Sequence, residues 1–217
     1  MKGIIIDGVA ASGKTSILRN LNKSLVEIKP TTTKFFISEH YTERMLEHLK
    51  ESGGLTGLYI NRHVDKIINI LQQFQNMLSE SKFSNDPRDA DLLVILERFI
   101  LTHLTSLDIE NEYKNEIVES HFKALNSLGI KQVALVVPEE HLKERIMSTI
   151  NYRNMAWKEY LFSKGDEAEI LKYYSDWQNK FLRYLNKYKY IIDTMIIEIR
   201  DTDYQKYSDL IIKEYFN

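Results

Sequence analysis

The sequence predicts an α/β protein in which helices cover both faces of a parallel sheet. Three observations lead to this prediction. Short apolar runs alternate with longer stretches of helical periodicity along the chain. The first run, Ile4-Ile5-Ile6, is apolar at consecutive positions, as in a strand buried on both faces. No Pro-rich linker, internal repeat or low-complexity tract divides the 217 residues, so we expect one domain over 1–217.

Each predicted strand is a short apolar run with a polar or turn-forming segment beside it. The second is centred on Phe35-Phe36-Ile37, the third is the run from Leu92 to Leu96, and the fourth ends before Pro138. The predicted strands occupy residues 2–7, 34–38, 91–97, 131–137 and 194–200.

The predicted helices are placed by apolar spacing and by start and stop signals. Gly53-Gly54 and Gly57 separate two of them, and Asp166 followed by Glu169 is an N-cap with its partner. The aromatic residues of the penultimate helix recur on one stripe, which indicates core packing. The predicted helices occupy residues 14–25, 40–51, 57–80, 110–127, 139–150, 166–188 and 204–215.

The first strand runs directly into the segment GVAASGKT, residues 8–15, and then into a helix. Glycines let backbone N–H groups turn inward, and the helix N-terminus points its positive dipole end at the same place. In this pattern Lys14 binds the β- and γ-phosphates and the Thr15 hydroxyl binds Mg²⁺. The sequence therefore predicts a three-layer P-loop NTPase fold with a five-stranded parallel sheet, and ATP and Mg²⁺ as ligands. The expected nucleotide-binding residues are Gly8, Ala11, Ser12, Gly13, Lys14, Thr15 and Ser16.

Polar residues follow the first three predicted strands. Asp7 ends the first, Glu39 follows the second, and Glu97-Arg98 ends the third. Ligands of open parallel sheets gather at the carboxyl ends of the strands, so we expect these side chains to meet. Four apolar residues followed by Glu97 form a Walker B arrangement, in which the carboxylate holds Mg²⁺. The planar cation of Arg98 suits phosphate oxygens.

Composition narrows the class of protein further. The net charge of −2 provides no general basic field, so no nucleic-acid partner is expected. The chain has no Cys, which excludes disulfides and thiolate metal sites. No apolar stretch approaches the length of a membrane span and no signal peptide is recognisable, so a cytoplasmic protein without membrane contact is expected.

These motifs together resemble the thymidylate kinase and deoxynucleoside kinase group of P-loop phosphotransferases. The resemblance rests on Asp7-Gly8 to Thr15, Glu39, Glu97-Arg98 and the helical segment Asn61-Arg62-His63. It implies an ATP-dependent kinase, with a nucleoside or nucleotide as the leading acceptor.

The resemblance also implies roles for individual residues. Glu39 corresponds to the carboxylate that takes the proton of the attacking hydroxyl, and Arg98 to an arginine near the transferring phosphoryl group. Arg62 is similar in position to an arginine that faces the acceptor. Arg145 matches the arginine that begins the lid, and Arg153 falls within the lid, for which we expect a mobile loop over 150–165. A homodimer is possible by the same analogy.

Departures from the group leave the acceptor open. The stretch 148–158 carries only Arg153 and Lys158 rather than an arginine cluster, and His40 follows Glu39 where the group has proline. A nucleoside, a nucleotide or another hydroxyl compound such as an antibiotic is compatible with these residues, and His40, His63 and His103 are candidates for a polar wall of the acceptor pocket.

Three other classes compete with the kinase. A GTPase should carry D-x-x-G and N-K-x-D motifs, which the chain lacks. A mechanical ATPase usually needs a helical lid domain and a longer chain. A nucleotide-binding regulatory protein without transfer activity is disfavoured by the combination of Glu39, Glu97 and Arg98.

Overall fold

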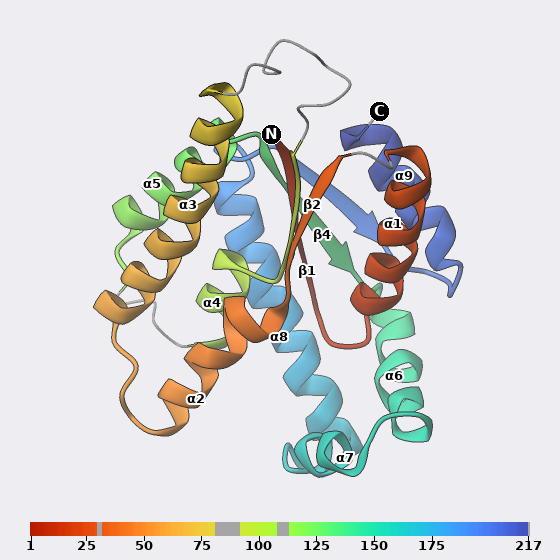
Figure 1. The fold of residues 1–217 in the computed structure, drawn as a ribbon. Coiled ribbons are helices and arrows are strands. Elements are labelled where there is room, and N and C mark those ends of the chain that lie inside the picture. Colours follow the sequence, from red (N-terminus) through yellow and green to blue (C-terminus); the bar gives the residue numbers. More distant parts are fainter. Residues whose placement is uncertain (30–31, 81–91, 108–112, 217) are drawn as a thin grey trace.

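A five-stranded, all-parallel sheet forms the centre of the molecule in the computed structural model, which describes residues 1–29, 32–80, 92–107 and 113–216 (Figure 1). The strand order is β2-β3-β1-β4-β5, which confirms the predicted five-stranded parallel sheet. The strands are β1 Lys2–Gly8, β2 Thr33–Ile37, β3 Leu92–Glu97, β4 Ile130–Val136 and β5 Thr194–Glu198.

Helices cover both faces of this sheet and the edge at which its strands end (Figure 1). One face carries α1 Lys14–Ile28 and α9 Tyr204–Tyr215. The other carries α3 Gly57–Glu80, α4 Ile100–Ser106, α5 Asn115–Ser127 and α8 Glu167–Tyr188. Beyond the strand ends lie the π-helix η1 His40–Arg44, α2 Met45–Glu51, α6 Glu139–Ser148, the 3-10 helix η2 Thr149–Asn151 and α7 Met155–Phe162.

The apolar run of β1 is buried from both sides, as its sequence predicts. Ile4 and Ile6 pack with α1 and α9, whereas Ile5 points to the opposite face and packs with α3, α4 and α8. All three side chains are fully buried. Alternation of side chains along a strand thus fixes β1 between two apolar layers, and the loop after it inherits a rigid base.

Most predicted elements agree with the structure, and the disagreements have identifiable causes. Helix α4 is missing from the prediction because all of its residues but Ser106 are buried, so no polar face alternates with an apolar one. The predicted helix 40–51 is divided into η1 and α2. The predicted helix 110–127 begins at Asn115, and residues 110–112 and Asp91 of the third predicted strand lie outside the described residues.

The expected loop over 150–165 was the largest error, because helix α7 occupies its centre. Asn154 caps this helix by accepting a hydrogen bond from the backbone N–H of Trp157, 3.0 Å away. Helix α7 ends at Phe162, so Ser163 and Gly165 lie in the connection to α8, which begins with the predicted capping box of Asp166 and Glu169.

The aromatic stripe of α8 packs largely as predicted. Phe181 and Tyr188 are buried, and Trp177 and Tyr184 pack against the same core. Tyr173 differs, since it is 37% exposed and its ring lies beneath the ammonium group of Lys164. Within the described ranges, no helix combines the length and the apolar character that a membrane span requires.

Candidate functional site

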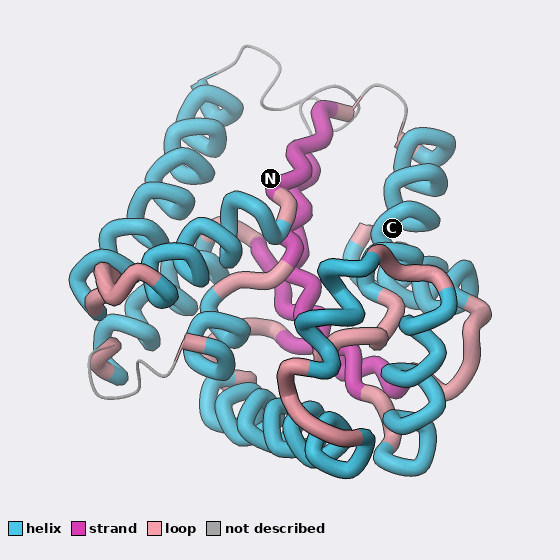
Figure 2. Tube along the Cα trace, turned by 90° about the horizontal axis from the view of Figure 1, so that it is seen from below, coloured by secondary structure: helices cyan, strands magenta, loops and turns pink. Residues whose placement is uncertain are grey.

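The strand order places the three predicted site segments at one edge of the sheet. Strand β1 lies between β3 and β4, with Ile6 opposite Glu97 and Gly8 opposite Leu135, and Ile37 of β2 lies opposite Leu96. Strands β2 and β3 lie on one side of β1, and β4 and β5 lie on the other. The direction in which strands are added to the sheet therefore reverses at β1. Ligands of open α/β sheets bind at such a point. Figure 2 views the molecule from the side where the strands end.

The loop from Gly8 to Lys14 is the predicted phosphate loop, and its backbone has the tight turns that the prediction requires. Gly13 adopts a φ of 84°, and a Cβ there would lie 2.2 Å from the ring of Tyr204. A Cβ on Gly8 would lie 2.4 Å from the carbonyl oxygen of Leu135. Both glycines are therefore required by geometry, and α1 starts directly after the second with the free N–H groups of its first turn.

Buried polar groups of this loop fit an anionic ligand. The Ser12 hydroxyl is buried and has no hydrogen-bond partner among the described residues. The Lys14 ammonium donates to the carbonyl oxygens of Gly8, 2.7 Å away, and Val9, 3.0 Å away. Burial and the nearby Arg98 cation lower the pKa of Lys14 to about 7. A phosphate would supply a partner for the hydroxyl and a countercharge for the ammonium group.

Two oxygen ligands suited to Mg²⁺ flank the loop. Thr15 is exposed in the first turn of α1, and Glu97 ends the neighbouring strand β3 with 8% exposure. Burial and the Glu39 carboxylate raise the pKa of Glu97. Among the described residues no cluster of three or more metal-ligating side chains occurs. Mg²⁺ bound chiefly by substrate phosphates needs only one or two protein oxygens, so the donor set fits.

An ion-pair network joins the ends of β2 and β3. The Arg98 Nε lies 3.0 Å from a carboxylate oxygen of Glu39, and the Glu39 backbone N–H donates to Glu97 Oε2 at 3.4 Å. Arg44 binds the other oxygen of Glu39 at 2.7 Å. Burial alone would raise the pKa of Glu39, but Arg98 and Arg44 outweigh it and hold that pKa below its usual range. The predicted meeting of Glu39, Glu97 and Arg98 is thus present in the structure.

Glu43 is a member of this network that the sequence reasoning missed. Its side chain is 5% exposed and lies 3.2 Å from Arg98 Nε. Burial raises the pKa of Glu43 to about 7, although Arg98 opposes the shift. The signal that could have found it is the four-residue spacing from Glu39, which places both carboxylates on one side of a helical turn.

Asp7 ties the phosphate loop to the turn after β3. Its fully buried carboxylate accepts hydrogen bonds from the Thr102 hydroxyl at 2.5 Å, the Gln132 amide at 3.1 Å and the Phe99 backbone N–H at 3.3 Å. Burial raises the pKa of Asp7. Since Phe99 follows Arg98, this carboxylate helps to fix where the arginine leaves the strand.

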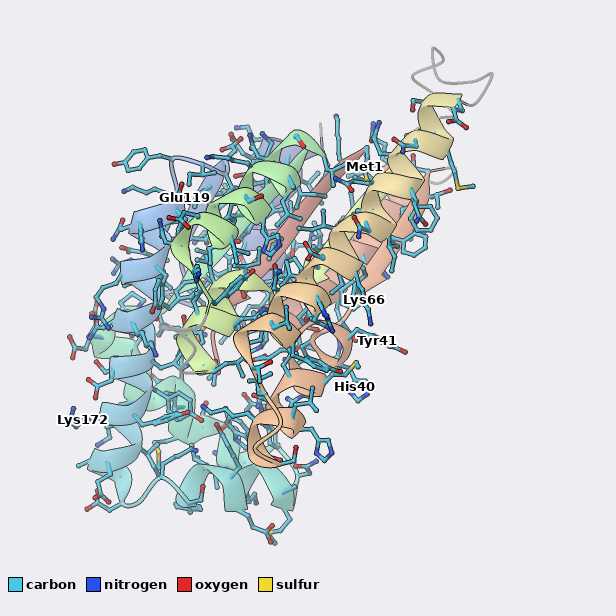
Figure 3. All side chains as sticks on the ribbon, turned by 90° about the vertical axis from the view of Figure 1, so that its left-hand side faces the viewer. Met1, His40, Tyr41, Lys66, Glu119 and Lys172 are labelled. Atoms are coloured by element: carbon cyan, nitrogen blue, oxygen red, sulfur yellow. The ribbon has the colours of Figure 1, made fainter. Side chains whose placement is uncertain are left out.

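The three candidate histidines take different positions. His103 is fully buried, and its Nε2 lies 2.5 Å from the carbonyl oxygen of Thr42. Burial lowers the pKa of His103 to about 3, so the ring is neutral and supports η1 rather than a pocket wall. His63 is half-buried, with its ring 6.2 Å from that of His103. His40 is exposed and projects outward beside Tyr41 (Figure 3).

Three predicted arginines are not joined to this network by any contact within the described residues. Arg62 is exposed on α3. Arg145 donates to the backbone carbonyl of Asp201, which ties α6 to the connection after β5. Arg153 is exposed and stacks on the Trp157 ring, with its guanidinium carbon 4.2 Å from the ring centroid.

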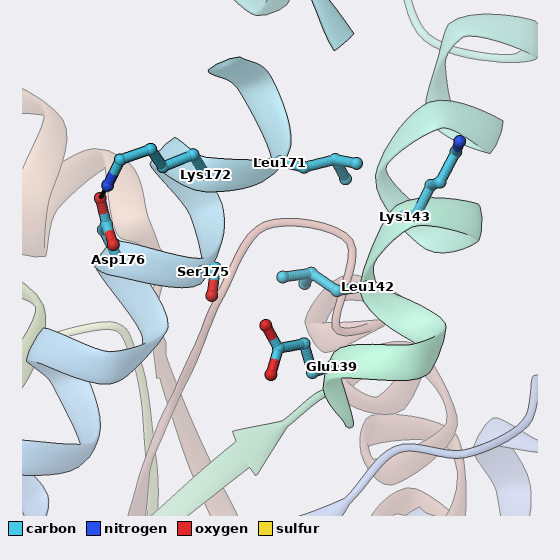
Figure 4. A pocket seen from close by; sticks show the side chains of 7 residues that line it. All are labelled: Glu139, Leu142, Lys143, Leu171, Lys172, Ser175 and Asp176. Carbon is cyan, nitrogen blue, oxygen red and sulfur yellow. Dashed lines mark hydrogen bonds and ion pairs between the residues drawn. The ribbon is translucent and has the colours of Figure 1, made fainter. Parts of the chain in front are cut away.

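A surface cavity of about 310 Å³ lies apart from these residues, between α6 and α8 (Figure 4). Its lining includes both carboxylates and ammonium groups, and Lys172 is already paired with Asp176 at 2.6 Å. None of its lining residues belongs to the phosphate loop or to the Arg98 network, so we assign it no chemistry. The lining residues are Glu139, Leu142, Lys143, Leu171, Lys172, Ser175 and Asp176.

Comparison with known proteins identifies the fold. No protein-family model matches the chain, and no curated protein matches it. The YorR protein of Bacillus subtilis, solved in complex with phosphorylated GDP, is 15% identical, with 98% of this chain and 95% of that chain covered and a TM-score of 0.58. A gluconokinase from Sinorhizobium meliloti 1021 is 13% identical, with 98% and 92% covered and a TM-score of 0.50. A deoxyadenosine kinase from M. mycoides is 12% identical, with 98% and 97% covered and a TM-score of 0.49.

At these identities the similarity is one of fold. The predicted three-layer P-loop fold and the resemblance to the P-loop kinase group are confirmed at that level by structures that match nearly the whole chain. The acceptor, the nucleotide and the roles of individual residues do not follow from the fold.

The buried carboxyl of Glu43 leads to a prediction about stability. Its folded-state pKa of about 7 lies above its ordinary value of 4.5, so the folded protein binds the proton more tightly. The cost of the charge is therefore fully present above about pH 7 and disappears below about pH 4.5. At pH 8 we expect Glu43→Gln to raise the free energy of unfolding by on the order of 1–3 kcal/mol.

Urea unfolding at pH 8 and pH 5 measures this difference, which should shrink at the lower pH. Glu47→Gln is the matched control, because Glu47 is 40% exposed in the same segment and pairs only loosely with Arg44, at 3.7 Å. A Glu43→Gln variant that is less stable than the wild type at pH 8 would show that the Glu43 charge does not destabilise the fold.

Proposed function

We propose that the protein is an ATP- and Mg²⁺-dependent phosphotransferase that moves the γ-phosphoryl group to a hydroxyl or phosphate of a small molecule, with nucleosides and nucleotides as the leading acceptors. One observation carries the proposal. The phosphate loop with Lys14 ends β1, and the neighbouring strand ends bring Glu39, Glu97 and Arg98 together beside it. Donor-binding and proton-accepting groups at one sheet edge are what phosphoryl transfer needs.

The donor half of the proposed site consists of the loop and the start of α1. Backbone N–H groups of residues 11–16, the Ser12 hydroxyl and Lys14 would hold the phosphates of ATP, where Lys14 would exchange its two carbonyl partners for phosphate oxygens. Contact with phosphate raises the pKa of an ammonium group, so bound Lys14 would carry a full charge.

Thr15 and Glu97 would hold Mg²⁺, which when bound supplies positive charge to the phosphate oxygens. Glu97 reaches this position as the last residue of β3. Its backbone carbonyl accepts a hydrogen bond from the Thr42 hydroxyl at 2.6 Å, which fixes the end of the strand.

The transfer itself would use Glu39 and Arg98. The acceptor hydroxyl gives its proton to the Glu39 carboxylate as its oxygen bonds to the γ-phosphorus, and the bond between that phosphorus and the bridging oxygen of ADP breaks. The lowered pKa of Glu39 keeps it ionised at neutral pH, so it can accept the proton. Arg98 would stabilise the negative charge on the transferring group.

The segment 150–165, which includes α7, is proposed as the lid of a single domain that covers residues 1–217. Arg153 would reach the phosphates only after it leaves the Trp157 ring, and Arg145 is bound to the connection after β5. Arg62 stays a predicted acceptor contact. The cytoplasmic location, the absence of a nucleic-acid partner and a homodimer also stay predictions from the sequence.

The proposal is tested by incubating the protein with ATP, Mg²⁺ and a panel of nucleosides, nucleoside monophosphates, sugar acids and hydroxylated antibiotics. We expect at least one compound to gain the mass of a phosphoryl group. Lys14→Ala should lose ATP binding and transfer, whereas Lys23→Ala, exposed on the same helix, should behave as the wild type. Steady ATP hydrolysis without any phosphorylated compound would favour an ATPase instead.

A second variant separates binding from transfer. Glu39→Gln should bind ATP within about threefold of the wild-type affinity and lower kcat by about 100-fold or more, because the amide cannot take the proton. Equilibrium binding of ATP and initial rates of product formation measure the two quantities. Glu47→Gln serves as the control, and transfer by Glu39→Gln at the wild-type rate would remove Glu39 from the mechanism.

A further inference from the structure

The second carboxylate on Arg98 has no role in the mechanism above. We propose that Glu43 is a positioning residue, which together with Glu39 holds Arg98 by its Nε so that the two terminal nitrogens stay available to phosphoryl oxygens. This inference rests on the proposed function and adds a residue to it.

Both carboxylates make ion pairs with the same atom of the arginine. Glu39 lies 3.0 Å and Glu43 3.2 Å from Arg98 Nε, and they approach from consecutive parts of one helical segment that begins after β2. The Nε–H donates its hydrogen bond to Glu39, and the Glu43 carboxylate adds a second ionic contact at the same nitrogen, so two anions hold this side of the arginine. They consequently fix the plane of the guanidinium group, because its nitrogens are coplanar.

The opposite end of the guanidinium group is left free. Within the described ranges, neither Nη1 nor Nη2 of Arg98 donates a hydrogen bond, and neither belongs to the buried unpaired side-chain atoms. These nitrogens carry four N–H donors in a fixed fork, which matches the oxygens of a phosphoryl group. An arginine neutralised by bidentate pairs would not present such a fork.

The segment that carries Glu43 is itself held on both sides. The neighbouring Thr42 donates to the carbonyl oxygen of Glu97 at 2.6 Å, and its own carbonyl oxygen accepts from the buried His103 at 2.5 Å. Arg44 on the other side is bound to Glu39 through two of its nitrogens. The segment is a π-helix, an element that is rare in proteins overall but occurs often at functional sites. Glu43 is therefore placed by its surroundings and is not free to turn away.

The burial of Glu43 argues against a purely structural role, because a buried charge lowers the stability of the fold. The Glu43 side chain is 5% exposed and lies near the Glu39 carboxylate. Both carboxylates share a single cation, Arg98. A buried anion with half a partner costs stability, and residues that cost stability are concentrated where function requires them.

The first test is kinetic and uses Glu43→Gln, which keeps the size of the side chain and removes its charge. With an acceptor found in the panel, we expect kcat to fall by about 10-fold or more and KM for ATP to stay within about threefold, because Arg98 acts on the charge of the transition state. Glu43→Asp should recover part of the rate, and Glu47→Gln should leave it unchanged. A Glu43→Gln rate within twofold of the wild type overturns the proposal while leaving the proposed function intact.

The second test does not depend on activity. In ¹⁵N spectra of the ligand-free protein, the Arg98 Nε–H proton, which is bonded to Glu39, should exchange slowly with solvent. Glu43→Gln should accelerate its exchange by about 10-fold or more, because loss of the second anion lets the guanidinium group turn away from Glu39 more often. Circular dichroism confirms that the variant is folded. Equal exchange in both proteins overturns the proposal even if no acceptor is phosphorylated. Faster exchange in a protein without transfer activity supports the grip on Arg98 and removes only the proposed function.

Discussion

The ion pair between Arg98 and Glu39 is the interaction on which the rest of the site depends. The two residues are 59 positions apart in the sequence, and they follow the adjacent strands β2 and β3. Their contact therefore fixes the segment after β2 against the turn after β3. The backbone of Arg98 has a φ of 58°, a left-handed conformation that is unusual for a residue with a side chain. Its N–H is bound to the carbonyl oxygen of Ile6, which holds that conformation against β1.

This arrangement brings several charges into an interior that is mostly apolar. Burial alone would lower the pKa of Arg98, but Glu43 and Glu39 outweigh it and raise that pKa, so the arginine stays charged. Asp7 needs three hydrogen-bond donors to be accommodated beneath the same turn. The apolar layers on both faces of β1 hold the strand ends rigidly, so the charged groups keep their positions relative to one another. The low dielectric of the interior strengthens each ion pair and hydrogen bond among them.

The sequence predicted the frame and the centre of the site better than its surroundings. Consecutive β-branched residues before the phosphate loop identify β1, and an apolar run ending in Glu97 identifies β3, because burial on two faces leaves little choice of residue. The edge strand β2 has no buried residue, and its short apolar run Phe35-Phe36-Ile37 identifies it. Helix α4 was not predictable from periodicity since nearly all of it is buried, and α7 depends on the Asn154 cap, which resembles a loop residue. Glu43 was missed because a carboxylate on a helical turn is ordinarily solvated, and its burial depends on the tertiary contact with Arg98.

The central claim is that Glu39 and Arg98 act as one unit in phosphoryl transfer. A double-mutant cycle with Glu39→Gln and Arg98→Lys, measured as kcat/KM for the phosphorylated acceptor, tests this claim most directly. Residues that act as a unit give non-additive losses, so we expect the double variant to be about as slow as the slower single variant. Losses that multiply, as for two independent groups, would contradict the account.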